Sequence, residues 1–404
     1  MHKIYCTLFL FVALTFSIPL SLAHAAWQPT VAVCIMTAQT SVSLSVKSGT
    51  AVLKTDANAK PTKTLRPGMT LAVSTAGSTL TADGKPTKTT SLLVTSADER
   101  EPLVLTVNGK AYRGAIRTDL RGLAMNVVNI VRTEDYLQGV VPQEMPSAWP
   151  QDAQKAQAVA ARTFALANRG RHKADGYDLC ATTHCQSYGG IAAEEPGSTA
   201  AIAATYGEVL TYGASGKLID AVFHTDSGGC TDSSKAVWGT DIPYLQPAKE
   251  VQTKTQPWKR TWSTAAFAAT LSHKRNIGTL KRIQLTPLTI GKRASDRSAS
   301  GRVIAATFVG TKGTVRVTGS DLRSLFGLPS TLFDLRLDGG SVICTGYGAG
   351  HGLGLSQWGA KAFADAKQDY KTILAHYYVG TTLKELYKAA LCASAPRDAL
   401  AICR

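Results

Sequence analysis

The sequence predicts an α+β fold, with mixed strands around a central helix, a β-rich region before them and a basic, β-rich insertion within them. Three observations carry this prediction. Short alternating runs fill the chain before residue 110, an alanine-rich segment near residue 160 has helical periodicity, and a strand-like stretch rich in Lys and Arg begins near residue 249. With 44% hydrophobic and 18% charged residues among 404, the chain has ample apolar surface for a packed core.

The first 25 residues have the pattern of a secretory signal. Lys3 lies near the start, an almost uniformly apolar run covers residues 7–14, and Ala23-His24-Ala25 matches a signal-peptidase site. An N-terminal membrane anchor is the alternative, but the apolar run is short for a span and is soon followed by a serine and a proline. We therefore expect an exported protein, mature from about Ala26, in the periplasm, cell wall or extracellular space, without a stable membrane span after cleavage.

Export decides how the eight cysteines are interpreted. Cys6 lies in the signal, which leaves seven, and cysteines in an oxidising compartment usually pair. An odd number leaves at least one thiol free or committed to another role. Cys392 and Cys403 lie close together in the carboxyl-terminal tail, residues 391–404, and are candidates for a disulfide that holds this tail.

Residues 26–110 are expected to form the N-terminal β-rich region. Alternating runs at residues 41–46 and 103–107 are separated from their neighbours by turn signals such as Ala82-Asp83-Gly84 and Asn108-Gly109. The main domain, residues 111–390, then begins with a strand pair around residues 112–116 and 125–131.

Helical periodicity first appears after Pro142. Alanines recur at three- and four-residue spacing between residues 149 and 168, and Pro150 lies where the first turn of a helix tolerates proline. The basic stretch at 249–340 reads as a strand-rich insertion in this domain. Further helices are expected at residues 197–206, 359–366 and 370–378, and strands at 209–212 and 218–224.

Glu144 gives the sharpest chemical signal. It lies between Pro142 and Pro146 in an apolar stretch, where loss of hydration raises the pKa of a carboxyl and keeps it protonated as a general acid near neutral pH. Lys155 and Arg162 are seven residues apart in the following helix, so they share a face that could bind an anionic substrate group. The alternative is a glutamate favoured by a helix dipole, with Lys and Arg on a solvated face.

The segment 223–229 combines His, Asp and Ser near the end of a predicted strand. Near neighbours cannot form the triad of a serine hydrolase, whose members come from distant segments, and the chain has no Gly-x-Ser-x-Gly elbow. We therefore expect Asp226 and Ser227 to contact substrate, with a structural turn as the alternative.

Glycine occupies every second position in residues 346–354. The stretch contains no Gly-x-Gly-x-x-Gly pattern, and no Gly-Lys-Ser/Thr follows it, which disfavours phosphate binding. Such a backbone suits close approach to a sugar, with His351, Gln357 and Trp358 as hydrogen-bonding or stacking groups. Close packing of the loop under the helices is the alternative.

Two histidines and two cysteines lie within fourteen residues: His172, Cys180, His184 and Cys185. Two thiolates and two imidazoles complete a tetrahedral zinc site, and four protein ligands leave no open position, so the expected site is structural. A disulfide between the two cysteines, or between either one and Cys230, is the alternative that an oxidising compartment favours.

Several segments, taken together, resemble the SpoIID/LytB family. The resemblance runs in order from about Tyr112 to Leu386. It implies that Glu144 is the family's catalytic acid and that Lys155 and Arg162 occupy basic positions of its active-site helix. The segments that carry it are residues 139–165, 218–229 with Trp238-Gly239, 346–360, and His376-Tyr377-Tyr378 with Gly380-Thr381.

This family includes lytic transglycosylases that cleave peptidoglycan glycan strands stripped of stem peptides, and proteins described as enhancers of wall amidases. Lytic cleavage suits a single acid such as Glu144, because no second carboxylate has to activate water. A net charge of +16 agrees with an anionic wall polymer as partner. The rival hypothesis is a non-catalytic, wall-binding enhancer of an N-acetylmuramoyl-L-alanine amidase. Nucleic acid is not an expected partner, because Lys and Arg are scattered and no recognition module is evident.

Overall fold

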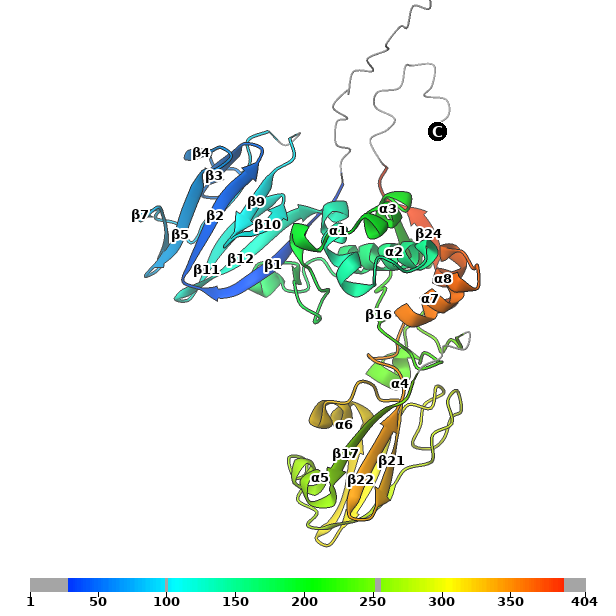
Figure 1. Ribbon diagram of the computed structural model, residues 1–404. Helices are drawn as coiled ribbons and strands as arrows, with labels where there is room; N and C mark the ends of the chain where they lie inside the picture. The colour runs from blue at the N-terminus through cyan, green and yellow to red at the C-terminus, as the bar shows by residue number, and fades with distance from the viewer. Residues whose placement is uncertain (1–27, 99–100, 251–255, 389–404) are drawn as a thin grey trace, which may run out of the picture. The chain divides into compact units, whose positions relative to one another are not determined.

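The computed structural model describes residues 28–98, 101–250 and 256–388 (Figure 1). The predicted signal segment, the carboxyl-terminal tail and the candidate pair Cys392 and Cys403 lie outside the described residues. Within the described ranges the chain is mixed α+β, which confirms the predicted fold class. No helix in them is long and apolar enough to cross a membrane.

Two sheets, in which most neighbouring strands are antiparallel, form the N-terminal β region. Alternation explains their burial: in β2 the side chains of Val42, Leu44 and Val46 point into the core while the serines between them are more exposed. The first sheet contains β13 (Leu179–Cys180), β1 (Thr30–Gln39), β12 (Ala124–Arg132), β11 (Ala115–Arg121), β8 (Ser91–Ser96), β3 (Ala51–Lys54) and β4 (Lys63–Leu65), in that order. The second contains β10 (Lys110–Arg113), β9 (Val104–Val107), β2 (Ser41–Ser48), β5 (Thr70–Ala76), β6 (Thr79–Ala82) and β7 (Lys85–Pro86).

The central helix is α2 (Gln151–Ala167), which confirms the helix expected at 149–168. All its alanines except Ala167 are buried, and their small side chains let neighbouring helices pack closely around it. These neighbours, which Figure 1 shows around α2, are α1 (Thr133–Glu144), α3 (Pro196–Ala204), α7 (Gln357–Asp365) and α8 (Tyr370–Tyr377).

Helix α1 corrects the expectation that helical structure begins after Pro142. Its buried residues Tyr136, Leu137, Val140 and Val141 follow helical spacing, and the helix runs through Pro142 and ends at Glu144. Proline is usually excluded from a helix interior because it lacks an N–H and its ring meets the preceding turn. Here Pro142 falls in the last turn, so only two residues of the helix follow it and little of the helix is disturbed.

The strand expected at residues 218–224 is divided in two. β15 (Lys217–Leu218) pairs with β14 (Glu208–Tyr212), which in turn pairs with β24 (Thr382–Glu385), whereas β16 (Phe223–His224) pairs in parallel with β23 (Leu355–Ser356). Between them the N–H of Val222 bonds to the carbonyl of Asp220 at 2.9 Å, a tight turn that breaks the strand.

The insertion has an apolar core of its own, in which Phe267 and Phe326 stack with their ring centres 4.3 Å apart. It is strand-rich as expected, but it continues beyond residue 340 to the end of β22, and it contains two helices that the sequence analysis did not predict. Its elements are β17 (Trp258–Ser263), α5 (Thr264–Leu271), β18 (Leu280–Gln284), β19 (Ala305–Gly310), β20 (Gly313–Thr318), α6 (Gly319–Phe326), β21 (Phe333–Asp338) and β22 (Ser341–Gly346). Before it comes the short helix α4 (Ser234–Trp238).

Candidate functional site

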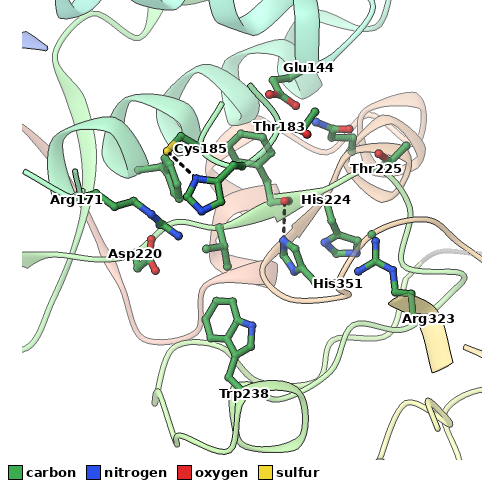
Figure 2. Close-up of a pocket in the computed structure, with 16 residues that line it drawn as sticks. Glu144, Arg171, Thr183, Cys185, Asp220, His224, Thr225, Trp238, Arg323 and His351 are labelled. Atoms are coloured by element: carbon green, nitrogen blue, oxygen red, sulfur yellow. Dashed lines mark hydrogen bonds between the residues drawn. The ribbon is translucent and has the colours of Figure 1, made fainter. Parts of the chain in front are cut away.

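A pocket of about 490 Å³ brings together segments that lie far apart in the sequence (Figure 2). Its walls come from the ends of α1 and α2, the loop before residue 186, the chain around β16, helix α6 of the insertion and the glycine-rich loop. The lining residues are Glu144, Phe164, Arg171, Thr183, His184, Cys185, Asp220, Val222, Phe223, His224, Thr225, Trp238, Arg323, Gly350, His351 and Gln357.

Glu144 is the last residue of α1 and lies at the upper edge of this pocket in Figure 2. Burial raises the pKa of its carboxyl, an effect that hydrogen bonds from Ser187 and Gln357 only partly offset. The backbone N–H of Ser187 donates to Oε1 at 2.9 Å. Gln357, at the first position of α7, is held in place because the neighbouring Ser356 caps that helix. The pocket therefore holds an oriented carboxyl that favours its protonated form.

Two of the three histidines that line the pocket, His224 and His351, are neutral near pH 7. Burial lowers the pKa of His351 to about 4 and takes that of His224 well below its ordinary value. His351 Nε2 lies 3.0 Å from the carbonyl of Phe223, and its Nδ1 accepts from the N–H of Leu353 at 3.1 Å, so the proton sits on Nε2. The sequence analysis placed His351 at the site. It singled out the segment that contains His224 but predicted no role for this residue.

Gly350 shows why this loop is rich in glycine. Its φ is +108°, and an added Cβ would come within 2.6 Å of the Cβ of His224. The loop packs closely against the chain that follows β16, and it also lines the pocket with Gly350 and His351. The loop is therefore closely packed, which is the structural alternative, and its place on the pocket wall leaves contact with a sugar as a prediction.

Asp226 and Ser227 were expected to contact substrate, but neither lines the pocket. Ser227 is fully buried and its Oγ accepts from the N–H of Gly229 at 2.9 Å. Oδ1 of Asp226 accepts from the N–H of Gly228 at 2.8 Å. Both side chains are used to close the turn that follows β16, which is the structural alternative. The polar sequence could not distinguish a turn held by side chains from a surface that binds sugar.

Arg162 corrects the expectation of a basic face that meets the substrate. Its side chain is fully buried, and its Nε and Nη2 donate to the two carboxylate oxygens of Glu134 at 2.7 and 2.8 Å. Lys155 is partly exposed, 3.6 Å from Asp152, with Nζ 5.8 Å from the ring centre of Tyr370, and it does not line the pocket. Helical spacing placed the two cations on one face correctly, but that face packs against other parts of the protein.

The four candidate metal ligands come together as expected. One donor atom from each of His172, Cys180, His184 and Cys185 lies within 4.8 Å of the other three. Cys185 Sγ is 3.4 Å from His172 Nε2, and Cys180 Sγ is 3.6 Å from His184 Nδ1. Donors of a tetrahedral zinc ion are about 3.3–3.8 Å apart, given zinc bond lengths of about 2.0–2.3 Å. These two distances fall in that range and both thiols are free, so the chemistry of the four residues fits zinc.

Comparison with known proteins identifies the family. Residues 122–212, which include Glu144 and the four candidate metal ligands, match the family model described as SpoIID, stage II sporulation protein. Over 276 residues, 64% of this chain, the sequence is 33% identical to stage II sporulation protein D of Bacillus amyloliquefaciens, and the match covers 76% of that protein. The chain belongs to the SpoIID family.

Two other relatives extend the comparison. A protein of Brachyspira hyodysenteriae is 34% identical over 289 residues, which cover 69% of this chain and 73% of that protein. A protein of Bacillus subtilis named amidase enhancer is 32% identical over 290 residues, 61% of this chain. This chain spans 40% of the length of the amidase enhancer. Membership of the SpoIID family confirms the resemblance drawn from the sequence.

Arg171, Asp220, Trp238 and Arg323 are among the lining residues that the sequence analysis did not propose for the site. Trp238 had been noted only as part of the family resemblance; it is 44% exposed, and its ring centre lies 6.2 Å from that of His351. Exposed tryptophans at helix ends are a signal that a search for sugar-binding residues could have used. Arg323 gave no such signal, because it lies on an insertion helix that was not predicted.

Proposed function

We propose that this SpoIID protein cleaves the glycan strands of peptidoglycan by lytic transglycosylation, with Glu144 as acid and then as base. The observation that carries the proposal is the protonation-prone carboxyl of Glu144 at the edge of a pocket large enough for sugar rings. Members of the family compared above are named for sporulation and for amidase enhancement, which agrees with a role of this protein in the cell wall.

The chemistry needs one carboxyl in two states. Glu144 first donates its proton to the glycosidic oxygen as the bond between this oxygen and C1 breaks. The 6-hydroxyl of the same muramoyl sugar then attacks C1, and the Glu144 carboxylate takes the hydroxyl proton. Glu144 ends protonated, the product has a 1,6-anhydro ring, and no water is consumed. Ser187 and Gln357 orient the carboxyl through both steps.

Asp220 is the second carboxyl of the pocket, and the competing mechanism, hydrolysis, depends on it. Hydrolysis would use it as a base for water, as in glycosidases with paired carboxyls. Figure 2 shows Asp220 across the pocket from Glu144, beside Arg171, and its Oδ1 accepts from Asn168 Nδ2 at 2.8 Å. These partners give Asp220 a role in fixing the wall of the pocket instead of activating water.

Mass spectrometry of the products separates these mechanisms. We expect purified, peptide-stripped glycan to yield fragments with anhydro ends, each lighter by one water than a fragment with a reducing end. Asp220→Asn is expected to keep the anhydro product. Reducing ends that disappear in Asp220→Asn would instead assign hydrolysis, with Asp220 as the base.

The second candidate function is stimulation of a wall amidase without glycan cleavage. The relative named amidase enhancer favours it, although this chain spans less than half of that protein. An enhancer would use the same pocket to bind the strand but would not need the Glu144 proton. Absence of any fragments, with stimulation of an N-acetylmuramoyl-L-alanine amidase by wild type and Glu144→Gln alike, would support this function.

We propose that the protein acts outside the cytoplasm, in the periplasm, cell wall or extracellular space. The signal-like segment at residues 1–25 and the net charge of +16 support this location, because a strongly basic protein is attracted to anionic wall polymers.

We propose further that His172, Cys180, His184 and Cys185 hold one structural zinc ion. His184 and Cys185 also line the pocket, so the metal would fix the shape of that wall. Protein purified without chelator is expected to contain about one zinc per chain by elemental analysis, and Cys185→Ser is expected to lose it. Cys344→Ser, which changes a buried free cysteine of the insertion, is the matched control and should keep the metal. A metal-free protein that yields a Cys180–Cys185 disulfide peptide would disprove the zinc site.

A further inference from the structure

Arginines line the pocket on opposite sides, and their surroundings differ (Figure 2). Arg171 follows α2, donates to Asn168 Oδ1 at 3.2 Å and lies beside Asp220 in the figure. Arg323 comes from α6 of the insertion. Its Nε donates to the carbonyl of Leu328 at 3.3 Å, and within the described ranges no carboxylate forms an ion pair with it. Among the residues that the structure describes, Arg323 is thus a partly buried cation without an anionic partner.

A second arginine, Arg302, is buried near Arg323. Arg302 is fully buried, with Nη2 2.7 Å from the carbonyl of Ser227, and its Nε and Nη1 have no hydrogen-bond partner in the described part of the chain. Burial is the main reason that the pKa values of His351 and His224 are low, and repulsion from both arginines adds to it. Figure 2 shows Arg323 beside His224. His224 and His351 are neutral, and the nearby carboxylates of Asp232 and Glu250 partly offset the charge of Arg302. Among the described residues no carboxylate does the same for Arg323.

A guanidinium removed from water and left without an anion costs free energy that a bound anion can recover. Leu328 fixes Arg323 through Nε, which leaves both Nη groups to donate side by side. This is the fork that matches the two oxygens of a carboxylate. The pocket therefore has the chemistry to bind a carboxylate on a sugar strand, at a fixed place relative to Glu144.

The strand of the proposed function carries such a carboxylate in one state only. The lactyl group of a muramoyl residue ends in a neutral amide while its peptide is attached, and in a free carboxylate after the peptide is removed. We propose that Arg323 binds this free carboxylate, so that the insertion makes the pocket selective for peptide-stripped strands. This inference rests on the proposed function, because it names the substrate feature that the same pocket recognises.

The charge of the insertion supports an anionic strand as ligand. Residues 256–346 contain 14 Lys and Arg against four Asp, a net +10. Scattered surface charge attracts any polyanion, including phosphate-rich wall polymers, and so cannot select among them. Selection needs a cation that is held in one orientation inside a cavity, and Arg323 meets this condition.

Binding measured without cleavage tests the proposal. Glu144→Gln serves as the background, and two probes are compared: peptide-stripped glycan strands and the same strands after their carboxyl groups are converted to methyl esters. We expect the charged strand to bind about 10- to 100-fold more tightly, as for a charge-assisted hydrogen-bond pair. Adding Arg323→Gln should remove this preference, and Arg323→Lys should restore part of it, because lysine keeps the charge but loses the fork.

Arg316→Gln is the matched control. It removes the same charge from an exposed position on β20 of the same insertion, outside the pocket, and should leave the preference intact. If Arg323→Gln, with a melting temperature near that of its background, still prefers the charged strand, the proposal is wrong. It is also wrong if Arg323→Gln weakens binding of polyglycerol phosphate but leaves the preference between the two glycan probes unchanged. Failure of wild type to release anhydro fragments would refute the proposed reaction alone, since this binding experiment does not depend on cleavage.

Discussion

Glu144→Gln is expected to lower the rate of glycan cleavage by about 100- to 10,000-fold, the usual contribution of a general acid–base group. Glutamine keeps the shape of the side chain and can still accept hydrogen bonds from Ser187, but it has no proton to give to the glycosidic oxygen. Binding of the strand should persist, so the loss should appear in kcat. The measurement is the release of anhydro-ended fragments from peptide-stripped glycan, followed over time by mass spectrometry.

The pKa of Glu144 sets the direction in which cleavage and stability change with pH. Burial raises the folded-state pKa of Glu144 above its ordinary value, and cleavage begins from the protonated acid. Activity of the wild type should therefore fall as pH rises through this elevated pKa. The same shift makes ionisation of Glu144 costly in the folded state, so native stability falls as pH rises above the pKa of the unfolded chain. Glu144→Gln removes this cost and should melt at the same or a higher temperature than wild type near pH 8.

Asp226→Asn is the matched control for this prediction. Asp226 is also a partly buried carboxyl with a raised pKa, but it faces the turn at Gly228 instead of the pocket. The Asp226→Asn variant should cleave glycan at a rate near that of wild type at temperatures where it remains folded. Near wild-type cleavage by Glu144→Gln, with a folded protein, would end the assignment of Glu144 as the acid.

The fold was predictable where local patterns decide it. Alternation in residues 41–46 predicted a strand, and alanine periodicity predicted α2, because each element buries one face that the sequence marks directly. Helix α1 was missed because Pro142 is a strong local signal against helix, while the tertiary packing of Tyr136 and Val140 outweighs it. The divided strand at residues 218–224 depends on two different partners, β14 and β23, which no local pattern reveals.

The site was predictable to the extent that local chemistry identifies it. Glu144 stood out because its neighbours are apolar, and His351 and Gln357 because of the glycine-rich loop, and all three line the pocket. The roles of charged residues depended on partners far along the chain. Arg323 reaches the pocket from the insertion, and Arg162 turns away from it toward Glu134, 28 residues earlier.

Arg162→Ala is expected to destabilise the protein by about 3–5 kcal/mol, because removing one partner of a buried ion pair leaves the other charge without compensation. Glu134 would keep the hydroxyl of Tyr387 and a weak contact from the N–H of Gly207, at 3.4 Å, but would lose both bonds to the guanidinium. Urea unfolding measures the effect.

Lys155→Ala is the matched control, on the same face of the same helix. Its contact with Asp152 is partly exposed, and pairs of this kind contribute at most about 1 kcal/mol. The double change Arg162→Met with Glu134→Leu should be less destabilising than Arg162→Ala, because it removes both charges and fills the space. The result also separates two roles for Arg162. A folded Arg162→Ala protein at low temperature should bind glycan like wild type. If it instead unfolds like wild type in urea but fails to bind the strand, Arg162 acts on the substrate and its buried pair with Glu134 is not its main role.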